Sequence, residues 1–407
     1  MITIIGGFYN EHCFYPHFDE KNGSGFRACR AIRGINQDID IKFHTYAPIE
    51  EETGLHFSGK ALNIDTNFYK SNQTITFQYD HPLRTPQIYP RPDLIIQSEP
   101  IEVKDGNILV YGMLEGSFKI SGVKVIYDPQ SPVKPIPFSK TGSSADHLAV
   151  VINHKEAKLI AGAPEEEKIV EFFFEVEKAE VLILKMGPKG AKVFVKGETP
   201  RIVPVYKTNN VWPIGSGDIF AAIFAYNWAI LDKSPVESAQ EASYGTALYC
   251  NSKNYGISVT TENDFITPLE IDNYPTGKVY LAGPFFNFSQ KWIINEAREC
   301  LYGLGMKVFS PLHDVGEGTV DQGIADDDIK GLESCDIVFA IVDGLDSGTI
   351  FEIGYAVKMQ IPVIVYSENE TEGNLLMIAG TGCLIVDDFA TALYKCLWVL
   401  AEREKNK

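Results

Sequence analysis

The sequence predicts an α/β fold in two domains, the second of which is a doubly wound parallel sheet. In residues 278–356, a short apolar run ending in Gly-Pro is followed by a helical segment, a strand, a helix and a further strand. This alternation is typical of a parallel sheet with helices on both faces. Similar strand-like runs recur earlier, at 123–128, 148–153 and 181–186. A stretch rich in Asn, Thr, Pro and Gly at 251–278 separates the two regions and favours a linker between domains.

Length and composition agree with a globular protein of this kind. A chain of 407 residues is long enough for two hydrophobic cores, and 45% hydrophobic with 22% charged residues is ordinary globular composition. The formal net charge of −18 argues against nucleic acid or an anionic membrane as a partner, because both require clustered Lys and Arg. Small anionic ligands remain compatible with the sequence, since a pocket can be positive on an acidic protein.

The cysteines and the start of the chain indicate a reducing compartment. There are 7 cysteines and no CxxC pair, which predicts free thiols rather than a disulfide framework or a zinc site. The histidines show no metal-ligand spacing, so we expect no metal site built from protein side chains alone. The opening MITIIGGFYNEH has neither the basic region nor the apolar length of a signal peptide. No stretch approaches the roughly 18 apolar residues of a membrane span. We therefore expect a cytoplasmic protein.

In the first domain the expected elements follow from local patterns. Ile2–Gly7 reads as a buried strand, and Gly23–Gly25 as a glycine loop that opens a helix. The span 38–120 is rich in Thr, Tyr, Phe and Ile with frequent turns, which predicts short strands rather than helices.

The segment Gly215-Ser216-Gly217-Asp218 is the main chemical candidate of this domain. It opens a segment with apolar residues near helical spacing. Glycines before a helix let the backbone approach an anion, whose charge the first N–H groups and the helix dipole stabilise. An aspartate in that first turn is placed to act as a base toward a hydroxyl. The alternative interpretation is a purely structural one, with Asp218 as a helix cap and the glycines as turn residues.

The surrounding motifs favour the chemical interpretation. In order along the chain they are YDPQ (127–130), NHKE (153–156), KMGPKGAKVF (185–194) and GSGDIFAA (215–222). In these motifs, residues 1–262 resemble the ribokinase-like PfkB carbohydrate kinase family. The resemblance implies an αβα domain with a small β lid, whose strands we expect within about 38–120, and it implies ATP and Mg²⁺ as cofactors. It makes Asp218 the catalytic base. The residues that it places around ATP and its phosphates are Gly215, Ser216, Gly217, Asn153, Glu156, Lys185, Gly187 and Gly190.

The acceptor side departs from the family pattern. Val211–Ile214 stands where the family has a Thr-containing segment, and the family's sugar-binding aspartate after the first strand is not evident. Asn10 and Glu11 are the polar candidates there. The acceptor therefore stays open between a sugar and a nucleoside hydroxyl.

In the second domain, Gln290–Leu304 is predicted as an amphipathic helix that ends at Gly305. Asp326–Asp328 is expected to cap the next helix, and Pro362–Tyr366 to form a further buried strand. In a doubly wound sheet the site lies beyond the carboxyl ends of the strands. Tyr280–Pro284 and Asp343–Thr349 are then expected to meet.

The motifs LAGPFF, CDIVFAIVDG and DSGTIFEIGYA in this region resemble the nucleoside 2-deoxyribosyltransferase family, over about the last 130 residues. The two resemblances give a domain at 1–262, a linker at 263–277 and a flavodoxin- or Rossmann-like domain at 278–407. Breaking an N-glycosidic bond builds positive charge on the sugar, which a nearby carboxylate stabilises and traps. The resemblance assigns that nucleophile to Glu352, which lies in an otherwise apolar segment.

The resemblance also implies the residues that hold the substrate. Asp346 would position the sugar or the nucleophile, Asp328 in preference to Asp327 would contact the base, and Tyr280 would hydrogen-bond the nucleophile. The full expected substrate-binding set is Tyr280, Gly283, Pro284, Asp327, Asp328, Ser347 and Gly348. No cofactor is implied for this domain. The alternative interpretation has Asp346 as a helix N-cap, the acidic triplet as a solvated cap and Glu352 as an exposed helix residue.

Together these observations predict a bifunctional enzyme that acts on small molecules: nucleosides, nucleotides or pentoses. Hydrolysis and transfer of the (deoxy)ribosyl group both stay open. Two alternatives do as well: a nucleotide-binding regulatory protein with a degenerate kinase domain, and an effector that cleaves nucleotides or NAD. The resemblances also imply a homo-oligomer.

Overall fold

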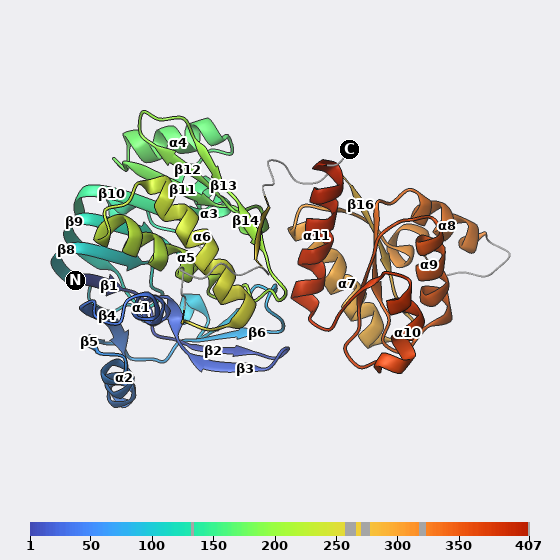
Figure 1. Cartoon of the computed structure of the whole chain (residues 1–407). Helices are drawn as coiled ribbons and strands as arrows, with labels where there is room; N and C mark the ends of the chain where they lie inside the picture. Colours follow the sequence, from blue (N-terminus) through green and yellow to red (C-terminus); the bar gives the residue numbers. More distant parts are fainter. Residues whose placement is uncertain (132–133, 257–265, 270–276, 317–322, 406–407) are drawn as a thin grey trace. The chain divides into compact units, whose positions relative to one another are not determined.

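The computed structural model describes residues 1–131, 134–256, 266–269, 277–316 and 323–405. The chain is divided into two compact units, Met1–Glu270 and Ile271–Lys407 (Figure 1). In the part of the chain that the structure describes, no helix has both the length and the apolar character needed to cross a bilayer.

The first unit is built on a nine-stranded sheet of order β13-β12-β11-β10-β9-β8-β1-β4-β5. All neighbouring strands run parallel from β5 to β11, and β12 and β13 add antiparallel at one edge. The strands are β1 (Ile2–Ile5), β4 (Ile41–Ala47), β5 (Ile64–Lys70), β8 (Ile101–Tyr111), β9 (Phe118–Asp128), β10 (Ser144–Asn153), β11 (Val181–Lys185), β12 (Ala191–Val195) and β13 (Arg201–Val203). The runs predicted at 123–128, 148–153 and 181–186 all fall on strands of this sheet.

Helices cover both faces of this sheet, because successive strand residues point to opposite sides. Leu109 packs in one core cluster and its neighbour Val110 in another. The first cluster takes residues from four helices: α1 (Gly23–Ile35), α2 (Ile49–Ala61), α5 (Ser216–Ala225) and α6 (Pro235–Ser252). The second takes residues from α3 (His154–Ala161) and α4 (Glu166–Glu175). Short helical segments are η1 (Pro92–Leu94), η2 (Phe138–Lys140), η3 (Gly187–Lys189) and η4 (Tyr226–Ile230). The predicted αβα architecture is present.

A separate four-stranded sheet, of order β3-β2-β6-β7, overlaps only in part with the span 38–120, in which short strands were expected. Its strands are β2 (Asn10–Cys13), β3 (Phe18–Lys21), β6 (Thr76–Tyr79) and β7 (Gln87–Tyr89). Two of them therefore precede the span 38–120, while β4, β5 and β8 within that span belong to the large sheet, and α2 is a helix. Aromatic and β-branched composition indicates extended backbone, but only tertiary pairing decides which sheet a strand joins.

The predicted linker also contains ordered structure. Strand β15 (Thr267–Leu269) pairs antiparallel with β14 (Val205–Lys207) of the first unit. The rest of the predicted linker up to residue 276, apart from Ile266, lies outside the described residues.

The second unit is a five-stranded, all-parallel sheet of order β17-β16-β18-β19-β20, as the alternating pattern predicts. Its strands are β16 (Lys278–Ala282), β17 (Lys307–Phe309), β18 (Ile337–Ile341), β19 (Val363–Tyr366) and β20 (Leu384–Val386). Its helices are α7 (Phe288–Gly303), α8 (Ile324–Glu333), α9 (Ser347–Lys358), α10 (Glu372–Gly380) and α11 (Phe389–Lys405), with a short turn η5 (Pro311–Val315). Strand β17 lies on one side of β16, and the next strand in sequence, β18, lies on the other side. The direction in which strands are added to the sheet therefore reverses between β16 and β18. In such sheets this reversal marks the binding crevice.

Candidate functional sites

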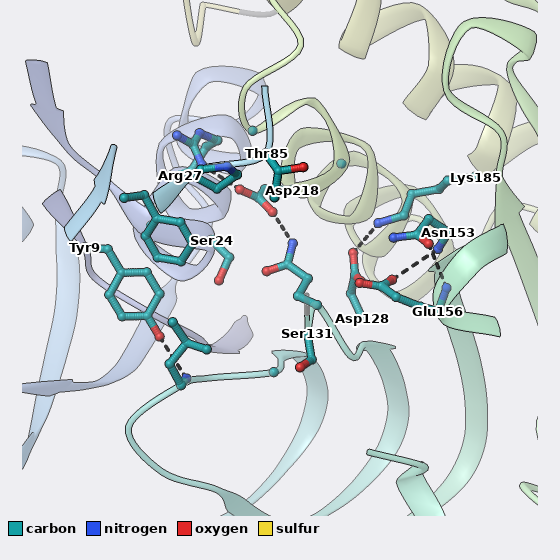
Figure 2. Close-up of a pocket in the computed structure, with 18 of the residues that line it drawn as sticks. Tyr9, Ser24, Arg27, Thr85, Asp128, Ser131, Asn153, Glu156, Lys185 and Asp218 are labelled. Atoms are coloured by element: carbon teal, nitrogen blue, oxygen red, sulfur yellow. Dashed lines mark hydrogen bonds and ion pairs between the residues drawn. The ribbon is translucent and has the colours of Figure 1, made fainter. Parts of the chain in front are cut away.

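A cavity of about 550 Å³ lies at the carboxyl ends of the central strands of the first unit (Figure 2). Asp128, Asn153 and Lys185, which line it, are the last residues of β9, β10 and β11. The small sheet contributes Glu11, Phe77 and Tyr79, and the start of α5 contributes Gly215, Gly217 and Asp218. This volume is in the ordinary range for a small-molecule site.

Backbone geometry explains the glycine at the start of α5. Gly215 is the N-cap, with φ of +75°, a conformation that favours glycine. A Cβ there would also lie 2.2 Å from Nε of Arg27. Asp218 follows in the first helical turn and is buried, with 7% of its surface exposed. The sequence prediction that this aspartate opens a helix behind glycines is therefore met.

Both oxygens of the Asp218 carboxylate already accept hydrogen bonds. Arg27 donates from one terminal nitrogen to Oδ2 at 2.6 Å, and Gln130 donates from its amide to Oδ1. Arg27 donates from its other terminal nitrogen to Glu11. The Arg27 side chain is almost fully buried, so the guanidinium bridges two carboxylates away from water. Burial raises the pKa of Glu11, and Arg27 opposes that rise.

Sequence reasoning missed Arg27 and gave no role to Gln130, although Gln130 lies within the YDPQ motif. One signal for Arg27 was present. In FRACRAIRGI the arginine stands beside Ala28 and Ala31, on a helix whose apolar residues face inward. A cation on the buried face of a helix requires a buried anionic partner. Glu11, a polar candidate for the acceptor side, is one such partner.

A second charge pair lies across the cavity, where Lys185 Nζ is 2.5 Å from Asp128 Oδ2 (Figure 2). Burial raises the pKa of Asp128 to about 7. Burial by itself lowers the pKa of Lys185, but Asp128 and Glu156 raise it above its ordinary value, so the amine stays charged. The ammonium also lies against the glycine loop, 3.2 Å from the position that a Cβ on Gly217 would take. Lys185 thus adds positive charge at the N-terminus of α5.

Asn153 and Glu156 form a capping box at the start of α3. The Asn153 side chain accepts from the Glu156 backbone N–H at 2.9 Å, and the Asn153 backbone N–H donates to Glu156. Both residues also line the cavity, and burial raises the pKa of Glu156. The helix cap therefore holds these two side chains at the cavity wall.

The glycines after β11 serve the turn into β12. Gly187 and Gly190 have φ of +56° and +83°, and a Cβ on Gly190 would come 2.2 Å from the carbonyl oxygen of Val203. Gly187 lines the cavity. Gly190 has a structural reason to be glycine whatever the cavity binds.

In the second unit, the structure brings Tyr280 and Glu352 together as the sequence predicts. The Tyr280 hydroxyl donates to Glu352 Oε1 at 2.5 Å, joining β16 to α9. Tyr280 is fully buried, and its ring stacks on Phe309 with the centroids 5.6 Å apart. The carboxylate is therefore held at the point where the strand order reverses.

Burial raises the pKa of Glu352 to about 7. The hydrogen bond from Tyr280 lowers this pKa, while Asp328 and Asp346 raise it. A carboxyl group whose pKa is raised this far by burial and by nearby charges is typical of a functional site. The alternative that Glu352 is an ordinary exposed helix residue does not fit its burial.

Asp346 is the N-cap of α9, which the alternative interpretation expected. Its Oδ2 accepts from the backbone N–H of Thr349 at 2.8 Å and from the Thr349 hydroxyl at 3.0 Å. Ser347 and Gly348 form the first turn of the helix. The Asp346 side chain thus caps α9 and also raises the pKa of Glu352.

The acidic triplet is corrected in one respect: Gly323, with φ of +72°, is the N-cap of α8, and the acids follow inside the helix. Asp327 is exposed and pairs with Lys330 at 3.2 Å. Asp328 is partly buried, and its Oδ1 has no hydrogen-bond partner in the part of the chain that the structure describes. Burial raises its pKa, with a smaller effect from Asp327. The negative charge of Asp328 contributes to the raised pKa values of Glu352 and Tyr280.

The remaining expected residues have packing roles. A Cβ on Gly283 would lie 2.8 Å from Ile294, so glycine lets α7 pack closely on β16, and Pro284 is buried beside it. Among the described residues, no group of three or more His, Cys, Asp and Glu side chains is arranged to hold a metal ion.

Comparisons with known families match both parts of the chain. Residues 119–262 match the pfkB family carbohydrate kinase model, and residues 279–392 match the nucleoside 2-deoxyribosyltransferase model. Both resemblances seen in the sequence are thereby confirmed. A search of curated proteins found no match.

Solved structures similar to this chain include two ribokinases and a fructokinase. Ribokinase from Thermotoga maritima is 19% identical, with a TM-score of 0.48, over 63% of this chain and 94% of that one. Ribokinase from Giardia lamblia is 14% identical, with a TM-score of 0.49, over 63% and 95%. Fructokinase from Vibrio cholerae O395, solved with fructose, ADP and calcium ion, is 14% identical, with a TM-score of 0.47, over 64% and 96%.

Proposed function

We propose that this chain, which joins a region of the pfkB carbohydrate kinase family to a region of the nucleoside 2-deoxyribosyltransferase family, is a bifunctional enzyme of nucleoside and sugar metabolism. Its second unit cleaves or transfers the (deoxy)ribosyl group of a nucleoside or nucleotide. Its first unit transfers the γ-phosphoryl group of ATP to a sugar or nucleoside hydroxyl.

The observation that carries the glycosidic activity is the Tyr280–Glu352 hydrogen bond, which lies where the strand order of the second sheet reverses. With Oε1 held by Tyr280, Glu352 presents its other oxygen to the anomeric carbon. A bond forms between that oxygen and the carbon while the C–N bond breaks, and the electron pair leaves with the base. Water or a second base then releases the sugar from Glu352.

Asp328 suits the role of partner to the leaving base. Because burial raises its pKa, it keeps a proton closer to neutral pH than an exposed aspartate does. Its Oδ1 has no hydrogen-bond partner among the described residues, and a substrate could supply one. Asp346, fixed as the cap of α9, positions the helix that bears Glu352.

The kinase activity rests on Asp218 in the first turn of α5, behind the glycine loop. The carboxylate accepts the proton of the acceptor hydroxyl, whose oxygen bonds to the γ-phosphorus. The bond from that phosphorus to the β–γ bridging oxygen breaks, and ADP leaves with the electron pair. The N–H groups of Gly215–Gly217 and the Lys185 ammonium stabilise the migrating phosphoryl charge.

The residues across the cavity fit Mg²⁺, which binds through one or two carboxylates together with phosphates and water. Asp128 has a buried Oδ1 that finds no hydrogen-bond partner among the residues that the structure describes, and Glu156 also lines the cavity. These two would hold the ion, which supplies charge neutralisation at the phosphates when bound.

One observation favours a second candidate for the first unit, a nucleotide-binding module without kinase chemistry. Arg27 and Gln130 already occupy both oxygens of Asp218, so no acceptor hydroxyl reaches the base unless one of them moves. Consumption of ATP with any member of a panel of pentoses, nucleosides and pyrimidine alcohols supports the kinase. Binding of ATP without consumption supports the module.

The glycosidic proposal is tested by product analysis with 2′-deoxynucleosides, nucleoside monophosphates and NAD, each with and without a second free base. Free sugar as the product indicates hydrolysis, and a new nucleoside indicates transfer. Absence of base release from every substrate would rule out this activity for the second unit.

A further inference from the structure

The contact between Gln130 and Asp218 has no part in the phosphoryl-transfer chemistry described above. Gln130 lies two residues beyond the end of β9, at the cavity wall, and donates its amide hydrogen to Asp218 Oδ1. Asp218 Oδ2 is held by Arg27, which Glu11 fixes in turn. Figure 2 shows Asp218 beside Arg27 at the cavity. The one oxygen left for a substrate is therefore the oxygen that Gln130 covers.

Backbone geometry holds Gln130 in this position. Its φ is +35°, in the left-handed region that side chains other than Gly and Asn rarely adopt. The preceding residue, Pro129, packs its carbonyl oxygen onto Gly112, where a Cβ would lie only 1.9 Å away. Strain of this kind persists only where the surroundings impose it, and it is common at functional sites.

Gln130 is nevertheless only partly buried, unlike Asp218 and Arg27. Its amide is neutral, so the bond to Asp218 is weaker than the ion pair that Arg27 makes. Of the two groups on the carboxylate, Gln130 is the one that an incoming hydroxyl displaces.

We propose that Gln130 is the specificity gate of the phosphoryl acceptor site: its amide occupies the position of the acceptor hydroxyl on Asp218 until the acceptor displaces it. The inference rests on the proposed kinase function. An acceptor that fills the cavity has binding energy with which to displace the amide, and a single water molecule does not. The gate thereby selects a sugar or nucleoside hydroxyl over water.

The reaction that the gate suppresses is hydrolysis of ATP. In it, Asp218 takes a proton from water while the water oxygen bonds to the γ-phosphorus. The bond from that phosphorus to the β–γ bridging oxygen breaks, and ADP leaves with the electron pair. The products are ADP, inorganic phosphate and a proton.

The test compares ATP hydrolysis without any acceptor in the wild-type full chain and in Gln130→Met and Gln130→Ala. Methionine keeps the length of the side chain and removes the donor, so it separates the hydrogen bond from the volume. We expect roughly 10²-fold faster release of phosphate in both variants, the lower end of the range that a positioned base contributes. Adding Asp218→Asn to either variant removes the gain. Gln240→Ala, which changes an exposed glutamine on α6 that does not line the cavity, serves as the matched control.

Two further readouts do not depend on turnover. Calorimetry with MgATP is expected to give the same affinity for wild type and Gln130→Met. In the free wild-type protein, the side-chain amide protons of Gln130 should exchange slowly with D₂O by NMR, and faster in Asp218→Asn.

The outcomes separate the gate from the kinase. Unchanged or slower hydrolysis in Gln130→Met, with MgATP still bound, overturns the gate and leaves the kinase standing. Fast exchange of the Gln130 amide in wild type also overturns it. If wild type binds no MgATP at all, the kinase proposal fails, and the gate fails with it.

Discussion

At Glu352, burial favours the protonated carboxyl group, whereas the proposed reaction requires the ionised form. Its surroundings raise its pKa to about 7, yet a nucleophile has to be ionised to attack. The folded-state pKa lies above the ordinary value, so the proton is lost only as pH rises through about 7. Glycosidic cleavage is therefore expected to increase with pH up to that point and then level off.

Tyr280→Phe tests the source of this pKa. The Tyr280 hydrogen bond lowers the pKa of Glu352, so its removal raises the pKa further and moves the acidic limb of the pH–rate profile to higher pH. The measurement is kcat/KM for base release from a 2′-deoxynucleoside at a series of pH values. The matched control is Tyr355→Phe. Tyr355 lies on α9, like Glu352, but its hydroxyl donates to Glu333, so the acidic limb of the pH–rate profile should not move in this variant. If the acidic limb does not move in Tyr280→Phe, the hydrogen bond from Tyr280 does not set the pKa of Glu352.

Glu352→Gln should abolish cleavage, by about 10³-fold or more, because the amide has nearly the same shape and is a poor nucleophile. The same variant should be more stable than wild type at pH 8. The raised pKa means that ionisation of Glu352 opposes folding once the pH exceeds the unfolded-state value, and the full cost is present above about 7. Removing this cost is worth on the order of 3 kcal/mol.

The check on stability is urea denaturation at pH 4 and pH 8, with exposed Glu299→Gln as the control. A stability gain in Glu352→Gln that is equal at both pH values, or turnover close to that of wild type, would remove Glu352 from the proposed mechanism.

Among the secondary-structure elements, the N-termini of α5 and α9 carry the two candidate sites. Each helix begins at a residue that its own cap or turn requires: Gly215 for α5 and Asp346 for α9. The carboxylates of Asp218 and Glu352, for which catalytic roles are proposed, follow within the next two turns, so the start of each helix determines their positions. A change at the cap therefore affects both stability and geometry.

Two substitutions of Asp346 separate those effects. Asp346→Ala removes the oxygen that accepts from Thr349 and should cost about 1 kcal/mol of stability. Asp346→Asn keeps a capping oxygen and should leave stability nearly unchanged. If the charge of Asp346 positions the sugar, cleavage falls in both variants. Wild-type cleavage in Asp346→Asn would show that the residue is a cap and nothing more.

Helix α1 contributes Arg27, whose removal leaves Glu11 and Asp218 buried without a counter-ion. Arg27→Met is expected to lower stability by about 3–5 kcal/mol, the cost of breaking a buried pair. Because Arg27 lowers the pKa of Glu11, its loss raises that pKa further, and the deficit should shrink at acidic pH.

Arg33→Met on the same helix is the control, since Arg33 donates to the backbone carbonyls of Leu62, Asn63 and Gln37. The loss of Arg33 leaves only neutral carbonyl groups without a donor. The loss of stability in Arg33→Met should therefore not depend on the ionisation of Glu11. Urea denaturation at pH 5 and pH 8 distinguishes the two. A pH-independent deficit in Arg27→Met contradicts the ion-pair account.

For the whole molecule, the question is why the two units share a chain. The proposed activities suit consecutive steps on one metabolite: a sugar released at Glu352 is phosphorylated at Asp218, or a phosphorylated nucleoside is then cleaved. Tethering raises the local concentration of the second site to roughly millimolar for a short linker. The implied self-association of the chain stays a prediction.

Isotopically labelled deoxynucleoside, supplied with and without MgATP, tests the order of the steps. Labelled sugar phosphate that depends on ATP, with free sugar accumulating in Asp218→Asn, indicates that cleavage comes first. Loss of all cleavage in that variant puts phosphorylation first. If neither Asp218→Asn nor Glu352→Gln changes the products of the other unit, the idea of consecutive steps is wrong.

Local pattern in the sequence was sufficient for much of this description. Strand and helix periodicity, with glycine turns, predicted the αβα unit and the parallel sheet, because those signals depend on neighbouring residues. Short motifs identified Asp218 and Glu352, and the predicted partnership of Glu352 with Tyr280 is present in the structure.

Only the tertiary structure decided what surrounds these carboxylates. Arg27 and Gln130 meet Asp218 across separations of 191 and 88 residues, and β2 pairs with β6 although other strands lie between them in sequence. The raised pKa of Glu352 likewise depends on burial by several elements at once. Hydrophobic period and turn chemistry specify where a segment begins, ends and faces. They carry no information on which distant polar groups burial will force to pair, and that pairing sets the chemistry of both sites.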